Sequence, residues 1–246
     1  MIDKVLRVAN PTIRSVSRLS TANTPLSETI TKYSSPLEHP DYFGVCSLVR
    51  VSDLHDNKVH LGHKEGSLHP SMRQYVLGAR LGHTIIDIDI TAGLLRRALQ
   101  VTAHIVYRGG LVLFLSPPGR PILARATENL AKEVQEFAHA RPWRKGTFTN
   151  SEKLFNTVTR LPDLCVFLAT PHEAIKDAAK MNIPSIGILD TNSDPEFVTY
   201  HVPGNDDSPS AIQLYCKLFS QTVLQAKKLR SRDQPDIDGI PTVKDS

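Results

Sequence analysis

Apolar and polar positions follow two patterns along the middle of the chain. Residues 111–115, 164–168 and 183–189 form short runs that are almost entirely apolar. Such runs are typical of strands buried on both faces, as in a parallel sheet. Shorter strands are expected on either side of these runs. The full set of expected strands is 75–80, 84–88, 111–115, 164–168, 183–189 and 198–202.

Between these strands, apolar residues recur every three or four positions, which predicts amphipathic helices. Helix starts are indicated by Ser52, Thr91 and Ser208 as capping residues, the last followed by Pro209 at the first helical position. The expected helices are 48–59, 91–108, 122–137, 172–181 and a long one from residue 209. Residues 60–72, which contain two glycines and a proline, are expected to form a loop.

Strands that alternate with helices predict a parallel sheet covered on both faces. We therefore expect an α/β fold, a flavodoxin-like doubly wound and mostly parallel sheet with helices on both faces. In such folds ligands bind where the strands end. Those ends are 116–120, 170–172 and 190–195.

The first 20 residues are typical of a mitochondrial transit peptide. They contain four basic residues and one acidic residue, and apolar residues fall on the opposite side of a helical wheel. We divide the chain into this transit peptide at 1–20, an extended arm at 21–45, an α/β domain at 46–230 and a disordered tail at 231–246. The mitochondrial matrix is the expected location.

Composition narrows the class of protein. The chain has 246 residues, 40% hydrophobic, and no apolar stretch long enough to cross a membrane. The three cysteines are far apart in the sequence, which suits a reducing compartment. The net charge is +4, and the segment 1–20 carries +3 of it, so a basic surface has to be found locally.

Candidate catalytic groups are present but do not form a known motif. The sequence lacks a glycine-rich phosphate loop, and Pro117 and Pro118 have no amide hydrogen to offer a phosphate. His60, His63 and His69 come nearest to a metal set, with two close ligands, a third on a loop and no cysteine nearby. Zinc needs three or four convergent ligands, so a packed or RNA-facing role is favoured. Aspartates at 190, 194, 206 and 207 have the composition of a magnesium site but also of ordinary turns, which we favour. We expect no cofactor and no metal.

Several short strings, taken in order, resemble the ribosomal protein S-two family, the second protein of the small ribosomal subunit. The strings are His60-Leu-Gly-His63, His69-Pro-Ser-Met72, Gly78-Ala-Arg80, Gly146-Thr-Phe-Thr-Asn150, Leu161-Pro-Asp163, Asp190-Thr-Asn-Ser-Asp-Pro195 and Pro203-Gly-Asn-Asp-Asp207. Together with the basic start, they resemble the mitochondrial branch.

This resemblance implies a structural constituent of the mitochondrial small ribosomal subunit and not an enzyme. Its implied partners are small-subunit rRNA and neighbouring ribosomal proteins, with no membrane and no small-molecule substrate. The alternative is a flavodoxin-like nucleotide- or metal-binding enzyme that uses Asp190 and Asp194.

The chain departs from the family pattern in three places. Bacterial members carry a long helical hairpin before the Pro-Asp motif, whereas here only 151–161 separate the two flanking motifs. The coiled-coil insertion is therefore expected to be absent. The usual Arg-Trp-Leu-Gly-Gly string is replaced by Pro142-Trp-Arg-Lys-Gly146, and the usual Gly-Thr-Lys turn by Ser116-Pro-Pro118.

RNA recognition rests on phosphate contacts from arginine and lysine and on base stacking. The best basic cluster surrounds Trp143, which is expected either to stack on a base or to belong to the core. Asn150 is expected to contact RNA or to cap a helix at 151–160. The predicted RNA-binding residues are His60, His63, His69, Arg73, Arg80, Arg141, Trp143, Arg144, Lys145 and Asn150.

Overall fold

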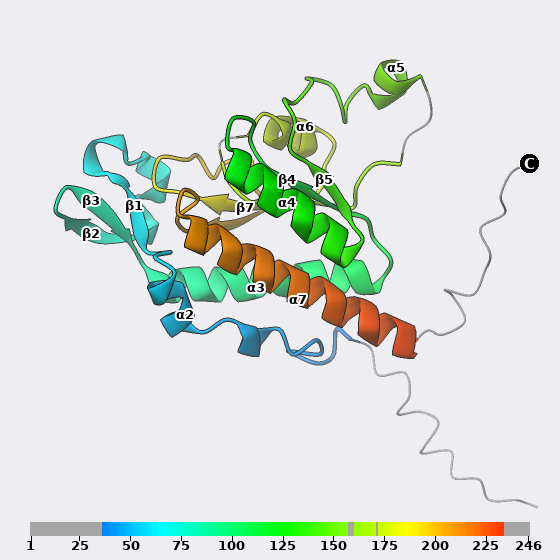
Figure 1. Ribbon diagram of the computed structural model, residues 1–246, viewed down its shortest axis with the longest axis horizontal. Coiled ribbons are helices and arrows are strands. Elements are labelled where there is room, and N and C mark those ends of the chain that lie inside the picture. The colour runs from blue at the N-terminus through cyan, green and yellow to red at the C-terminus, as the bar shows by residue number, and fades with distance from the viewer. Residues whose placement is uncertain (1–35, 157–159, 171, 234–246) are drawn as a thin grey trace, which may run out of the picture. The chain divides into compact units, whose positions relative to one another are not determined.

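The computed structural model describes residues 36–156, 160–170 and 172–233 (Figure 1). The expected transit peptide lies outside these residues, as do most of the arm and tail. Among the described residues, no helix combines the length and apolar character that crossing a membrane requires. The described part contains a five-stranded sheet, a three-stranded sheet and the helices that cover them.

The larger sheet confirms the expected fold. Its strands are β4 (Val112–Leu115), β5 (Phe137–His139), β6 (Leu164–Phe167), β7 (Ser185–Leu189) and β8 (Tyr200–Pro203). All neighbours pair in parallel in the order β5-β4-β6-β7-β8. The first strand of this sheet thus lies between the second and the third, which is the flavodoxin-like order. The chain reverses its direction of winding between β4 and β6.

Side chains of each buried strand alternate between two cores, because successive residues of a strand point to opposite faces. Phe114 and Val166 face a core formed with α3 (Ile88–Tyr107), α4 (Pro121–Val134) and α7 (Pro209–Asp233). Leu115 and Phe167 face the second core, which includes α6 (Ala174–Lys180) and Trp143. Helices therefore cover both faces, and α7 lies between α3 and α4 (Figure 1).

The smaller sheet is antiparallel and precedes the larger one in the chain. Its strands are β1 (Leu61–Lys64), β2 (Val76–Arg80) and β3 (His83–Ile86), in the order β1-β3-β2. The strands expected near 75–80 and 84–88 are thus confirmed. The loop expected at 60–72 is wrong, since it contains β1 and short 3-10 helices at Glu65–Ser67 and Pro70–Tyr75. The pairing of β1 with distant β3 outweighs the local turn signal of its glycine.

Two helices begin at other residues than expected. Asp87 caps α3, because its Oδ1 accepts the amides of Asp89 and Ile90 at 2.9 and 3.3 Å. Thr91 instead lies in the first turn, and its hydroxyl donates to the carbonyl of Pro203 at 2.9 Å. The first expected helix is shorter, with α2 at Val51–Asp56 after a 3-10 turn at Cys46–Leu48, and Ser52 lies inside it.

Two further boundaries are corrected. Phe137, expected on a helix face, begins the edge strand β5 and is 57% exposed. The helix expected at 151–160 is the short α5 (Ser151–Phe155), which ends at Asn156 in a left-handed conformation. Asn150 occupies its cap position without a side-chain cap bond. At the other end of the domain, Phe43 and Val45 of the expected arm are buried in the first core.

Candidate nucleic-acid interface and the carboxyl edge of the sheet

The carboxyl ends of four parallel strands meet at one edge of the large sheet, where flavodoxin-like folds bind their ligands. Arg120 follows β4, Thr170 follows β6, and Asp190 directly follows β7. Asp206 and Asp207 follow β8. The Asn205 side chain shapes this last turn, because its Oδ1 accepts the amides of Asp207 and Ser208 at 2.9 and 3.0 Å. The motifs at 190–195 and 203–207 are thus neighbours in space.

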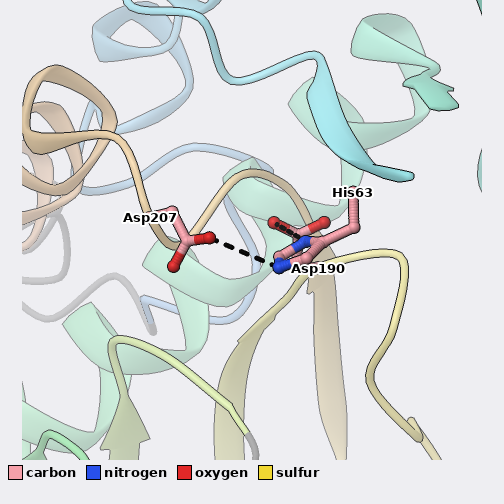
Figure 2. A group of neighbouring side chains, drawn as sticks. All are labelled: His63, Asp190 and Asp207. Carbon is pink, nitrogen blue, oxygen red and sulfur yellow. Dashed lines mark ion pairs between the residues drawn. The ribbon is translucent and has the colours of Figure 1, made fainter. Parts of the chain in front are cut away.

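His63 from β1 inserts between two of these carboxylates (Figure 2). Its Nδ1 lies 3.1 Å from Asp190 Oδ2, and its Nε2 lies 3.3 Å from Asp207 Oδ2. Asp190 is almost fully buried at 1% side-chain exposure, and its Oδ1 accepts the amide of Thr191 at 2.5 Å. Among the described residues, His63 is the cationic side chain paired with Asp190, so its loss would leave a buried carboxylate without that partner.

Threonine side chains hold β1 against the end of β7. The hydroxyl of Thr191 accepts the amide of His63 at 3.0 Å and the hydroxyl of Thr84 at 3.1 Å. Thr84 also lies 2.9 Å from the carbonyl of His63, which accepts this hydrogen bond as well. Gly62 is needed here, because a Cβ at that position would lie 2.5 Å from both Thr84 Oγ1 and Thr191 Cγ2. The small sheet is therefore fixed closely to the edge.

Arg120 completes the network on the other side. Its guanidinium lies 3.3 Å from Asp206 Oδ1 and 3.0 Å from Asp207 Oδ1. Asp206 is buried and its Oδ2 accepts the amide of Thr170 at 3.1 Å. Asp207, which is half exposed, thus joins His63 to Arg120.

Burial and charge act in opposite directions on the titration of this network. Burial disfavours the charged form of His63, but the adjacent carboxylates of Asp190 and Asp207 outweigh it and raise the pKa of His63. Burial raises the pKa of Asp206 to about 6, against the attraction of Arg120. The network therefore favours the proton-bound forms of both His63 and Asp206.

The edge contains side chains that could bind a metal, but not the pair of Asp190 and Asp194 that the enzyme alternative requires. His63, Asp190 and Asp207 each offer one ligand atom, all within 4.8 Å of one another. In the described structure these atoms pair with each other. Asp194, which the enzyme alternative requires, is exposed and accepts the amide of Glu196 at 3.1 Å in a local turn. Among the described residues it does not belong to this ligand group.

The first group of predicted RNA-binding residues lies on and around the small sheet, and its members have different surroundings. His60 stacks on His55 with ring centroids 4.6 Å apart, and His63 is engaged by the two aspartates. His69 Nδ1 accepts the amide of Ser71 at 3.4 Å and so caps the following 3-10 helix. Arg73 and Arg80 are exposed. The two arginines are therefore the available cations of this group.

The second predicted group lies between β5 and α5. Arg141, Arg144 and Lys145 are exposed, as is Asn150. Trp143, by contrast, is only 8% exposed, and its Nε1 donates to Asp177 Oδ2 at 3.0 Å. Its ring meets the rings of His139, Phe148 and His172 edge to face. Of the two alternatives for Trp143, the structure favours the core residue over the base-stacking one, and Arg144 and Lys145 beside it are exposed.

The sequence profile of ribosomal protein S2 matches residues 54–163 and 153–226. The small ribosomal subunit protein uS2m of Bos taurus is 46% identical over 203 residues, which cover 80% of this chain and 69% of that protein. The chain belongs to the ribosomal protein S2 family. The resemblance found in the sequence is thereby confirmed.

Two other relatives show how the similarity extends. The uS2m protein of Neurospora crassa is 36% identical over 208 residues, 73% of this chain and 47% of that protein. The uS2 protein of Azorhizobium caulinodans is 32% identical over 230 residues, 75% of this chain and 66% of that protein. The two profile segments meet at 153–163, where the bacterial hairpin is expected to be missing. Between Gly146 and Leu164 the described residues contain only α5.

Sequence reasoning about S2 motifs missed the partners of the named residues. The sequence identifies the motifs at 60–63, 190–195 and 203–207, but it does not predict the ion pairs between them. The paired segments are far apart in the chain: His63 and Thr191, which share a hydrogen bond, are 128 positions apart. Arg120 lies within the expected ligand-binding end 116–120, but no role was predicted for its side chain. Its position after β4, at the expected ligand edge, was the available signal.

Proposed function

We propose that this chain acts as a structural constituent of the mitochondrial small ribosomal subunit, where it binds rRNA and neighbouring ribosomal proteins during mitochondrial translation. As a member of the S2 family it is a ribosomal protein and not an enzyme. The observation that carries this function is the 46% identity with a mitochondrial relative over 80% of the chain. The mitochondrial relatives also assign it to the mitochondrion, and we infer the matrix.

Exposed cations support rRNA as a direct partner. Arg80 ends β2 of the small sheet, and Arg73 lies on the 3-10 helix Pro70–Tyr75 that precedes this strand. Arg141, Arg144 and Lys145 project from the segment anchored by Trp143. Arginine forms paired hydrogen bonds to phosphate, and such contacts fix a protein on RNA without selecting sequence. The histidines, whose rings are engaged within the protein, contribute less directly by positioning these segments.

The enzyme alternative receives no support from the carboxyl edge. The carboxylates that a metal-dependent reaction would use are paired with His63 and Arg120. The turn after β4 contains two consecutive prolines, Pro117 and Pro118, which have no amide hydrogen to donate to a phosphate. We infer that this edge stabilises the fold and sets the small sheet in place.

Fractionation of a mitochondrial lysate on a sucrose gradient tests the proposed function. The protein should sediment with the small ribosomal subunit, and ribonuclease treatment should move it to the top of the gradient. A small free species in both gradients would contradict permanent membership of the subunit. A marker protein of the large subunit in the same gradients provides the control for intact particles.

A further inference from the structure

A hollow of about 890 Å³ opens beside the buried Trp143. It lies between the turn after β4, the segment at 142–149 and one face of α6. Its walls include Pro117, Pro118, Trp143, Lys145, Lys176 and Lys180. The hollow thus joins the basic cluster found in the sequence to two lysines of α6 that were not predicted to bind anything.

The three lysines give this hollow a positive rim. Lys176 and Lys180 are four residues apart on α6, so both project from the same side of the helix. All three lysines are exposed, and none lies within ion-pair distance of a carboxylate among the described residues. The Nζ of Lys176 lies over the ring of Phe197, 5.7 Å from the ring centroid. Like charges at helical spacing repel each other, so an anion between them would be stabilising.

The acidic and titratable neighbours do not cancel this charge. Asp177 lines the hollow, but it is buried and its Oδ2 accepts both Trp143 Nε1 and the Gly146 amide, at 3.0 and 2.9 Å. Glu173 is the exposed carboxylate on the rim. Burial lowers the pKa of His172 to about 4, so this ring is neutral. The rim therefore keeps a net positive charge at neutral pH.

We propose that this hollow binds the backbone phosphates of a single-stranded rRNA segment, with Lys145, Lys176 and Lys180 as the phosphate-binding side chains. The proposal rests on the proposed function and adds α6 to the surface that carries it. A positively charged groove that follows the backbone is typical of sites for single-stranded nucleic acid. Arg144, exposed next to Lys145, continues the positive surface beyond the rim.

A titration of the full-length chain with a short fluorescein-labelled oligouridylate tests the proposal. Lys176→Gln with Lys180→Gln should weaken binding and reduce the slope of log affinity against log salt by about 1.4, or about 0.7 for each lost contact. The matched control is Lys132→Gln with Lys228→Gln, which removes the same charge from exposed positions on α4 and α7. Equal slopes for the two variants would overturn the proposal. Circular dichroism should show the same thermal midpoint for both variants.

Photocross-linking in assembled subunits separates this inference from the proposed function. With 4-thiouridine incorporated into mitochondrial rRNA, the peptide containing Lys176 and Lys180 should carry an rRNA adduct. If the protein sediments with the subunit but that peptide carries no rRNA adduct, and a lysine-reactive cross-linker joins it to a neighbouring protein instead, the hollow is a protein-docking site and the inference is wrong. Failure of the unaltered protein to sediment with the subunit would instead overturn the proposed function.

Discussion

Trp143 is a buried residue in the middle of the exposed basic cluster formed by Arg141, Arg144 and Lys145. It is the only tryptophan of the chain, it is buried, and it shares the Asp177 carboxylate with the Gly146 amide. Trp143→Phe keeps an aromatic ring but removes the Nε1 donor. We expect the free energy of unfolding to fall by about 1–3 kcal/mol, because a buried carboxylate oxygen loses a partner.

Urea denaturation followed by circular dichroism measures this loss, since the variant has no tryptophan fluorescence. RNA affinity should change little while the variant is folded. The opposite result, unchanged stability with much weaker RNA binding, would show that Trp143 stacks on a base after all.

His63 makes stability depend on pH in a defined direction. Its pKa is raised in the folded protein, so its ion pairs contribute fully below the unfolded value of 6.5 and are lost as pH rises through the folded value. His63→Gln leaves Asp190 buried without a cation. We expect this variant to lose about 2 kcal/mol at about pH 6, less than for a fully buried pair because water reaches His63.

The difference in unfolding free energy between this variant and the unaltered chain should shrink as the pH rises through the raised pKa of His63 and the native imidazole loses its proton. Taking this difference cancels the contributions of the other histidines. His83→Gln is a suitable control, because His83 is exposed on β3 of the same sheet. A difference that grows with pH would show that His63 is neutral in the native state.

The docking of β1 on the large sheet can be tested through one glycine. Gly62→Ala places a methyl group 2.5 Å from Thr84 Oγ1 and Thr191 Cγ2, so either the strand or the threonines must move. We expect a loss of about 1–3 kcal/mol in urea denaturation, in the range of other overpacked sites. Gly78→Ala on β2 is the matched control, because its Cβ would meet nothing within 4 Å. Similar losses at both glycines would mean that β1 is not held closely.

Sequence patterns identified most of these elements because their signals are local. The buried runs of β4, β6 and β7 and the period of α3 depend on residues within a few positions of each other. β1 and β5 were missed because each is short and is defined by pairing with another strand. For the same reason the ion pairs of His63, which join residues more than 120 positions apart, could not be derived from spacing. Exposed arginines were identifiable as candidates, whereas the burial of Trp143 required the fold.

At the scale of the whole molecule, the structure separates an edge of paired charges from a surface of exposed cations, to which we assign RNA binding in our proposal. The carboxyl edge, which in other flavodoxin-like proteins binds a ligand, is here bridged by His63 and Arg120. The cations without a carboxylate partner among the described residues include those at 144–145 and on α6. We therefore expect that removing the charge of these exposed cations leaves folding unchanged but weakens assembly into the small subunit.

Arg144→Ala with Lys145→Ala tests this division. Both side chains are exposed, so we expect an unchanged thermal midpoint. Incorporation into the small subunit is measured on sucrose gradients at increasing salt. It should fail at lower salt than for the unaltered protein, because each lost phosphate contact weakens RNA binding; each also reduces the salt slope by roughly one unit. Lys132→Ala with Lys228→Ala removes two positive charges from α4 and α7 and should assemble normally. Normal assembly of the first variant would exclude its two cations from the RNA-binding surface, whereas a lowered midpoint would mean that they stabilise the segment around Trp143 instead.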